Sequence, residues 1–150
     1  MIFQIVSNFN KVLRKFLLGS YRQEKISSQI TRAIIDLKYQ KEIKILDYGS
    51  GYFKPSMANL ISKNLKERNI TSHFVCLDFY EDDELKKMNS KKNIKYMNLN
   101  KFKYINDIFD YCIIADTLHH IGEGVENLDN LSSLLKMIKK KATLFAFFLF

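Results

Sequence analysis

The sequence predicts an α/β fold built on a parallel sheet. Short apolar runs that end in polar residues alternate with longer segments in which apolar residues recur at three- and four-residue steps. Such alternation favours parallel strands joined by right-handed helical crossovers. One proline and five glycines among 150 residues favour long regular elements, and a hydrophobic fraction of 47% is enough for one core.

The first predicted strand leads into a glycine turn. The strand is predicted over residues 43–48 and carries Asp47 near its end, and Gly49 and Gly51 follow at a spacing of two. Glycine has no Cβ, so the backbone can turn tightly there and a ligand can approach it closely. Open α/β sheets bind their ligands at such strand-to-helix turns. The carboxylate would repel a pyrophosphate and attract a cation, such as the ammonium of an amino-acid moiety.

Four further runs are predicted to be strands. Residues 73–78 end in Asp78, residues 94–100 end in Asn100, and residues 109–116 end in Asp116. The continuous apolar run over residues 142–150 predicts a fifth, buried strand. Its phenylalanines would make an exposed sheet edge prone to pairing with another chain, so self-association through this edge is expected.

Helices are predicted before the first of these strands and between the later ones. Apolar stripes over residues 2–17 and 26–37 indicate two helices, the second with Ile26, Ile30, Ala33, Ile34 and Leu37 facing inward. We expect residues 1–40 to form a helical segment packed on the core formed by residues 41–150. A further helix is expected after the glycine turn, with Pro55 in its first turn and an apolar stripe of Met57, Leu60, Ile61 and Leu65. Another is expected to begin at the acidic run 81–84. A last helix is expected over residues 128–138, with Lys139–Lys141 at its C-terminal end.

The positive charge of the chain is concentrated in its first third. The formal net charge is +8, and residues 1–44 contain nine basic residues but only three acidic ones. A basic amphipathic helix there is compatible with an anionic membrane surface, while the overall charge is compatible with nucleic acid. General abundance of lysine explains the same excess without a partner. Because the aromatic residues of this segment lie on its apolar stripe, nucleic acid is not the expected partner.

In this order, the motifs resemble those of class I S-adenosylmethionine-dependent methyltransferases. The similarity covers residues 41–150 and implies a Rossmann-like, doubly wound, mostly parallel sheet of order three-two-one-four-five. It also implies S-adenosylmethionine as cofactor and methyl transfer to a small-molecule acceptor. The chain ends within strand five, so the last two strands of the family are lacking, and a truncated domain is expected.

The resemblance assigns cofactor contacts residue by residue. Asp47 and the backbone of Gly49, Ser50 and Gly51 would hold the methionine end. Asp78 would accept hydrogen bonds from the ribose hydroxyls, Phe79 would pack on the adenine, and Asn100 would lie near the adenine amino group. Asp116 would lie near the methyl-donor end. A strand-end or helix-cap acid is the alternative for Asp78, and a turn residue is the alternative for Asn100.

Asp116, His119 and His120 are the candidate catalytic residues. Methyl transfer requires in-line alignment and exclusion of water, and a base only where the acceptor carries a proton of high pKa. One of the adjacent histidines would face the acceptor, and a structural role is the alternative for both. No metal site is expected, because no third ligand has suitable spacing.

Two departures from the motifs bear on the function. Lys54 stands where a dinucleotide-binding fingerprint requires glycine, which disfavours a nicotinamide cofactor. Phe53 replaces only the third, least strict glycine of the methyltransferase motif. The alternatives to a small-molecule methyltransferase are an RNA methyltransferase, or a non-catalytic or truncated cofactor-binding domain that needs a partner.

The remaining features indicate the compartment. Cys76 and Cys112 lie inside predicted strands and are expected to be small buried residues, not disulfide partners. A reducing cytoplasm is therefore the expected location. No apolar run reaches the ~20 residues that a membrane-spanning helix needs, and the N-terminus does not resemble a signal peptide.

Overall fold

The structure is a computed structural model that describes residues 21–37, 40–51, 56–88, 92–100, 108–115 and 138–147. The helix expected over residues 2–17, Pro55, and residues 128–137 of the helix expected over residues 128–138 lie outside the described residues. Most of the expected sheet and the glycine turn lie inside them.

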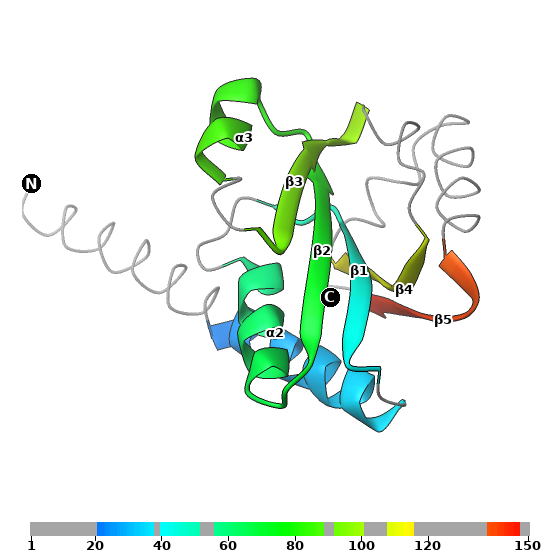
Figure 1. The fold of residues 1–150 in the computed structure, drawn as a ribbon. Coiled ribbons are helices and arrows are strands. Elements are labelled where there is room, and N and C mark those ends of the chain that lie inside the picture. The colour runs from blue at the N-terminus through cyan, green and yellow to red at the C-terminus, as the bar shows by residue number, and fades with distance from the viewer. Residues whose placement is uncertain are drawn as a thin grey trace, which may run out of the picture.

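The core of the fold is a five-stranded sheet of order β3-β2-β1-β4-β5, and all four strand pairs are parallel. Figure 1 shows β2 between β3 and β1. The predicted strand order is thereby confirmed. The strands are β1 (Glu42–Tyr48), β2 (Thr71–Asp78), β3 (Ile94–Asn98), β4 (Phe109–Ala115) and β5 (Ile138–Phe147).

Both faces of the sheet are apolar, as is typical of parallel sheets covered on both sides. Successive side chains of a strand point to opposite faces, so Ile43 and Ile45 of β1 join one cluster of buried residues while Leu46 and Tyr48 join another. Both clusters continue through β2 and β4. This double burial explains why the strands read as almost continuous apolar runs in the sequence.

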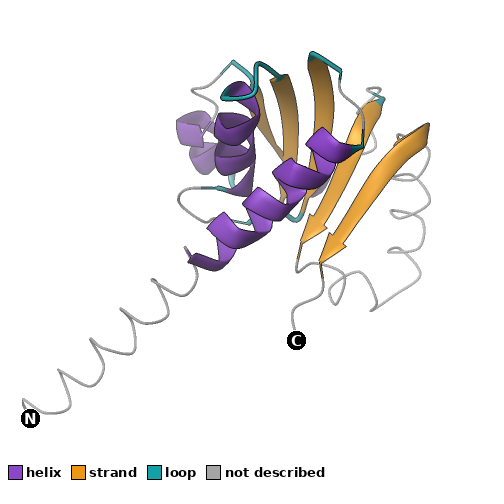
Figure 2. Cartoon of the chain, turned by 90° about the horizontal axis from the view of Figure 1, so that it is seen from below, coloured by secondary structure: helices purple, strands orange, loops and turns teal. Residues whose placement is uncertain are grey.

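Three described helices pack on the same face of the sheet. They are the helix of residues 21–36, α2 (Met57–Lys66) and α3 (Asp82–Met88). Figure 2 shows the helix of residues 21–36 lying across that face. Ile30, Ile61 and Leu65 are fully buried in one cluster with the sheet, and Leu85 packs against it.

The inward face of the helix of residues 21–36 differs from the prediction. Ile30 and Ile34 are buried as expected, but Leu37 is 49% exposed because the helix ends there. Ser27 and Thr31 are buried instead, and their hydroxyls donate to backbone carbonyl oxygens one turn earlier. Polar residues can occupy this face because the helix satisfies them internally.

The buried stripe of α2 differs from the prediction at two positions. Met57, Ile61 and Leu65 are buried as expected, and Ala58, which was not expected in the stripe, is fully buried as well. Leu60 is only half-buried.

The start of β5 corrects a third prediction. Ile138 and Lys139–Lys141 were expected at the end of a helix, but they belong to the strand. Phe109 pairs with Ile138 and Tyr111 pairs with Thr143, so the register shifts between these two pairs. Ile138 pairs with β4 before the shift, and the irregularity accommodates the extra residues between Ile138 and Thr143. β5 ends at Phe147, with residues 148–150 outside the described part.

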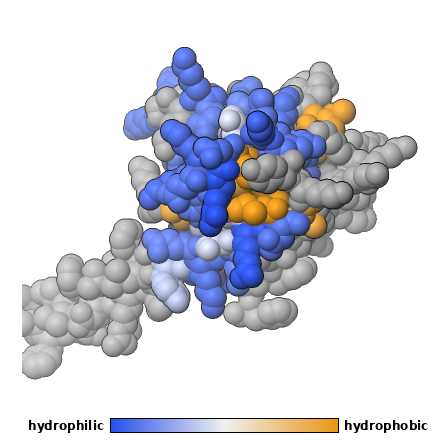
Figure 3. Space-filling view, turned by 60° about the horizontal axis from the view of Figure 1, so that its bottom comes forward, coloured by the Kyte–Doolittle hydropathy of each residue, from blue (hydrophilic) through white to orange (hydrophobic). Residues whose placement is uncertain are grey.

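The surface of the described part is mostly hydrophilic on the side shown in Figure 3, with a smaller hydrophobic area among polar side chains. Arg22, Lys25 and Arg32 are exposed on the outward side of their helix. No helix among the described residues is long and apolar enough to cross a bilayer. Membrane contact through residues 1–20, the domain boundary at residue 40, and self-association through β5 stay predictions.

We predict that Ser56→Ala lowers the free energy of unfolding by about 1–2 kcal/mol. Ser56 is the N-cap of α2, and its hydroxyl accepts a hydrogen bond from the Asn59 backbone N–H at 3.3 Å and contacts the Tyr96 hydroxyl at 2.8 Å. Urea unfolding measures the effect. Ser28→Ala, at an exposed helical position, is the control and should change stability by less than about 0.5 kcal/mol. Equal midpoints for both variants would contradict the capping role.

Candidate functional site

The carboxyl ends of β1, β2 and β3 meet at one edge of the sheet because the three strands are parallel. Tyr48 pairs with Leu77, and Asp78 pairs with Asn98. The register therefore brings the acidic ends of β1 and β2, which are about thirty residues apart in sequence, to the same place. This is the edge at which open α/β sheets bind ligands.

The glycine turn after β1 is held by the end of β2. Gly49 and Gly51 have φ angles of 73° and 66°, values that disfavour residues with a Cβ. The backbone N–H groups of Gly49 and Ser50 both donate to the carbonyl oxygen of Leu77, at 2.8 and 3.1 Å. The turn therefore needs these glycines for its shape and β2 for its position.

Asp78 makes the next contact with this turn. One carboxylate oxygen accepts a hydrogen bond from the Gly51 backbone N–H at 2.7 Å, and the other accepts from the Phe79 N–H at 2.7 Å. A carboxylate oxygen can accept more than one hydrogen bond, so this geometry leaves acceptor capacity for ligand hydroxyls. The sequence assigned a ribose contact to Asp78 but did not indicate its bond to the turn.

Asp47 is a buried carboxylate without a counter-charge among the described residues. Its side chain is 1% exposed, and its Oδ2 atom has no hydrogen-bond partner in the described part of the chain. Burial, and to a lesser extent the nearby charge of Asp78, raise the pKa of Asp47 to about 7. A cationic group beside the glycine turn would stabilise the buried Asp47 carboxylate, so the site fits an ammonium.

Tyr80 is a site residue that the sequence analysis missed. Its side chain is 1% exposed, and its hydroxyl donates to the Gly51 carbonyl oxygen at 2.9 Å. The Ser50 hydroxyl also bonds to it. Burial is the main cause that raises the pKa of Tyr80, so the phenol stays protonated. Its place two residues after a strand-end acid was the available signal.

The two residues assigned to the adenine differ in their surroundings. Phe79 is 64% exposed at the end of β2 and presents an aromatic face to solvent. Asn100 is exposed beyond the end of β3, and its backbone N–H donates to the side chain of Asn98 at 2.9 Å. Asn98 also donates to the Tyr80 carbonyl oxygen at 2.7 Å, and thus links β3 to the same corner.

Asp116, His119 and His120 lie outside the described residues, so their catalytic assignment stays a prediction. The described part of the chain contains no group of three or more His, Cys, Asp and Glu residues that could hold a metal. Cys76 and Cys112 are buried free thiols, as predicted. Burial, with a smaller effect of Asp47, raises the pKa of Cys112 to about 12, so this thiol is a poor nucleophile at neutral pH.

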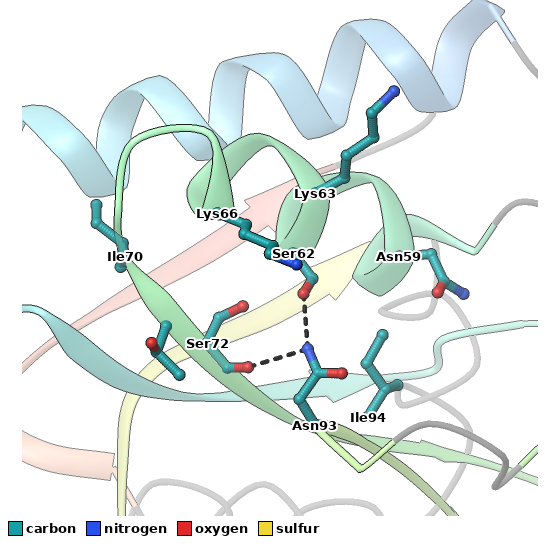
Figure 4. Close-up of a pocket in the computed structure, with 9 residues that line it drawn as sticks. Asn59, Ser62, Lys63, Lys66, Ile70, Ser72, Asn93 and Ile94 are labelled. Atoms are coloured by element: carbon teal, nitrogen blue, oxygen red, sulfur yellow. Dashed lines mark hydrogen bonds between the residues drawn. The ribbon is translucent and has the colours of Figure 1, made fainter.

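A pocket of about 420 Å³ lies away from this corner, at the amino ends of β2 and β3 (Figure 4). Asn93 lines the pocket, and its side-chain nitrogen donates to the Ser62 hydroxyl at 2.8 Å and to the Ser72 carbonyl oxygen at 3.3 Å. These groups fasten β3 to α2, so they indicate a structural junction. The lining residues are Asn59, Ser62, Lys63, Lys66, Ile70, Thr71, Ser72, Asn93 and Ile94.

Solved structures with a similar fold include methyltransferases. The chain superposes on the plantazolicin methyltransferase BpumL, crystallised with SAH (S-adenosylhomocysteine) and a monoazolic desmethylPZN analog, with a TM-score of 0.57 and 18% identity over 95% of this chain. The CMeT domain of the citrinin polyketide synthase gives a TM-score of 0.52 and 11% identity over 70% of this chain. No protein-family model and no curated protein sequence matches the chain.

These similarities establish the fold. The chain has the class I methyltransferase fold that its motifs predicted. It spans about half the length of BpumL, of which 51% is covered, and 28% of the chain that holds the CMeT domain. At these identities the likeness concerns the architecture, and the site chemistry depends on the residues of this chain.

We predict that the ligand-free protein loses stability as the pH rises from about 4 to about 7. The folded state keeps a proton on Asp47 up to pH of about 7, whereas the unfolded chain releases it near 3.8, so the folded state binds more protons throughout this window. The free energy of unfolding should then fall by roughly 1 kcal/mol per pH unit from this group. Thermal and urea unfolding across this window measure the slope.

The variant Asp47→Asn isolates this effect. It should be as stable as the wild type near pH 4 and more stable above pH 7, because it carries no buried charge there. Asp36→Asn, at an exposed helix end, should keep the wild-type slope. A wild-type slope in the Asp47→Asn protein would mean that other groups cause the pH dependence.

Proposed function

We propose that the chain binds S-adenosylmethionine at the carboxyl ends of β1, β2 and β3 and transfers its methyl group to a small-molecule acceptor. The observation that carries this proposal is the buried Asp47 carboxylate beside two positive-φ glycines. It combines a negative charge with a backbone that a ligand can approach. An amino-acid ammonium meets both requirements, and the fold supports this ligand class.

In this proposal each residue of the corner has a separate task. Asp47 attracts the ammonium of the methionine end, and the Gly49–Gly51 backbone accommodates it. Asp78 accepts hydrogen bonds from the ribose hydroxyls while it holds the turn through Gly51. Phe79 stacks on the adenine, and Asn100 approaches the adenine amino group. Asp116 is proposed for the methyl-donor end of the crevice.

The cofactor, when bound, supplies a methyl group already activated by the sulfonium. The protein has to orient the acceptor, align it with the sulfur–methyl bond and exclude water. His119 or His120 would accept the proton of an acceptor whose pKa is high, and the other histidine would be structural. This part of the proposal rests on the sequence motif.

A small molecule is the acceptor class that we favour. BpumL, which has a similar fold, was crystallised with azole-containing desmethylPZN analogs, and this supports acceptors of modest size. RNA is the alternative that the net charge of +8 suggests.

We predict that the protein binds RNA only weakly and with a steep dependence on salt, which filter binding measures. Tight, sequence-selective RNA binding would favour an RNA methyltransferase instead.

The buried free thiols support a reducing cytoplasm as the location of the protein.

A cofactor-binding domain that needs a partner is the second candidate. The chain covers 51% of BpumL, so the superposition leaves about half of that protein without a counterpart in this chain. Such a domain would bind the cofactor product yet show no turnover alone. Binding and turnover therefore have to be measured separately.

Isothermal titration with S-adenosylhomocysteine tests the proposal. The wild type should bind, and Asp78→Ala should bind at least about tenfold more weakly because hydrogen bonds to a charged acceptor are lost. Asp47→Asn should also weaken binding. Asp36→Asn, at an exposed position at the end of its helix, should bind like the wild type.

The outcome decides between the candidates. A folded wild-type protein that fails to bind S-adenosylhomocysteine would refute the proposed cofactor site. Binding without methyl transfer to any member of an acceptor panel would favour the partner-dependent domain. Binding with transfer to a small azole or phenol would support the leading proposal.

A further inference from the structure

We propose that Tyr80 and Tyr96 form a tyrosine clamp that positions both ends of the connection between β1 and α2. The clamp consists of these two side chains and their hydroxyl contacts with Ser50, Gly51 and Ser56. Its role in ligand binding rests on the proposed function, because this connection begins with the glycine turn. Neither tyrosine is among the residues to which the sequence assigned a cofactor contact.

Tyr80 holds the first end of the connection. Its hydroxyl donates to the Gly51 carbonyl oxygen at 2.9 Å. Since the phenol has one proton and uses it there, the Ser50 hydroxyl is the donor in the bond between Ser50 and Tyr80. One buried oxygen thus fixes the side chain of one turn residue and the backbone of the next.

Tyr96 holds the other end. Its hydroxyl lies 2.8 Å from the Ser56 hydroxyl, which caps α2, and 3.4 Å from the Asn59 side-chain nitrogen. The Asn59 side chain also donates to Ser56 at 2.7 Å. The first turn of α2 is therefore tied to the middle of β3.

The two rings support each other inside the core. Their centroids are 5.8 Å apart with an interplanar angle of 83°, which is a favourable edge-to-face contact. Both rings belong to the buried cluster between helices and sheet, and they are 1% and 6% exposed. Packing thus fixes the rings, and the rings fix where the hydroxyls meet the chain.

Loss of the tyrosine clamp should affect binding of the methionine end of the cofactor more than binding of the adenosine end. The clamp acts on Ser50 and Gly51, which face the amino-acid moiety in the proposed site, while Asp78 serves the ribose. Removing the Tyr80 hydroxyl should therefore weaken ligands that carry the amino-acid moiety and spare those that lack it. Loss of global stability would weaken both ligand types alike.

The test compares S-adenosylhomocysteine with 5′-methylthioadenosine, which lacks the amino-acid moiety. Tyr80→Phe keeps the ring contact and removes both hydrogen bonds, so it should bind S-adenosylhomocysteine about tenfold more weakly and 5′-methylthioadenosine within about twofold of wild type. Ser50→Ala, which removes one bond from the other side, should act in the same direction. Tyr111→Phe, a core tyrosine on β4, is the matched control and should change neither affinity.

Amide hydrogen exchange tests the clamp without any ligand. The backbone amides of residues 49–51 should exchange about tenfold faster in Tyr80→Phe than in wild type, and amides of β2 should not change. Tyr96→Phe should accelerate exchange at the first turn of α2 instead. Unchanged exchange in both variants, or equal weakening of the two ligands, would overturn the clamp. A wild type that binds neither ligand would refute the proposed function, and the exchange rates would still decide about the clamp.

Discussion

Three consecutive backbone amides of the glycine turn bond to two consecutive residues of β2, and the candidate site depends on these bonds. Gly49 and Ser50 donate to the Leu77 carbonyl oxygen, and Gly51 donates to the Asp78 carboxylate. The parallel pairing of β1 with β2 brings the partners to the same level of the sheet. Without this pairing the turn would lose its position, and the two acids would not share a corner.

The short distance between the carboxylates of Asp47 and Asp78 has an electrostatic cost. Asp47 is buried, and the charge of Asp78 nearby adds to the effect of burial on its pKa. A carboxylate held in this state lowers the stability of the ligand-free fold at neutral pH, a pattern typical of functional sites. The burial of Asp47 is therefore the observation on which the proposed cationic ligand rests.

The apolar core and the polar corner are connected through aromatic residues. Tyr80 and Tyr96 contribute their rings to the core and their hydroxyls to the connection between β1 and α2. Amphipathic side chains of this kind suit a boundary at which one end is apolar and the other meets polar groups. Rigidity of the core is thereby transmitted to a turn made of flexible residues. This explains how a glycine-containing turn can keep one defined shape.

Local patterns in the sequence determined the elements and their order. The alternation of strand and helix sufficed to predict a parallel sheet with right-handed crossovers, whereas the order of the strands in that sheet was implied by the resemblance of the motifs to a known family. The stripe of Ile30, Ile34, Ile61 and Leu65 was also readable, since each helix position faces the core at a fixed spacing. The resemblance of the motifs supplied the ligand class.

Only the tertiary structure decided which polar groups meet. The bond of Asp78 to Gly51 spans 27 positions, that of Tyr80 to Ser50 spans 30, and that of Tyr96 to Ser56 spans 40. The exposure of Leu37 and the start of β5 at Ile138 likewise depended on where a helix ends and where a neighbouring strand offers backbone partners. Sequence periodicity describes which face of an element is apolar, whereas contacts between distant polar residues depend on strand register and packing in three dimensions.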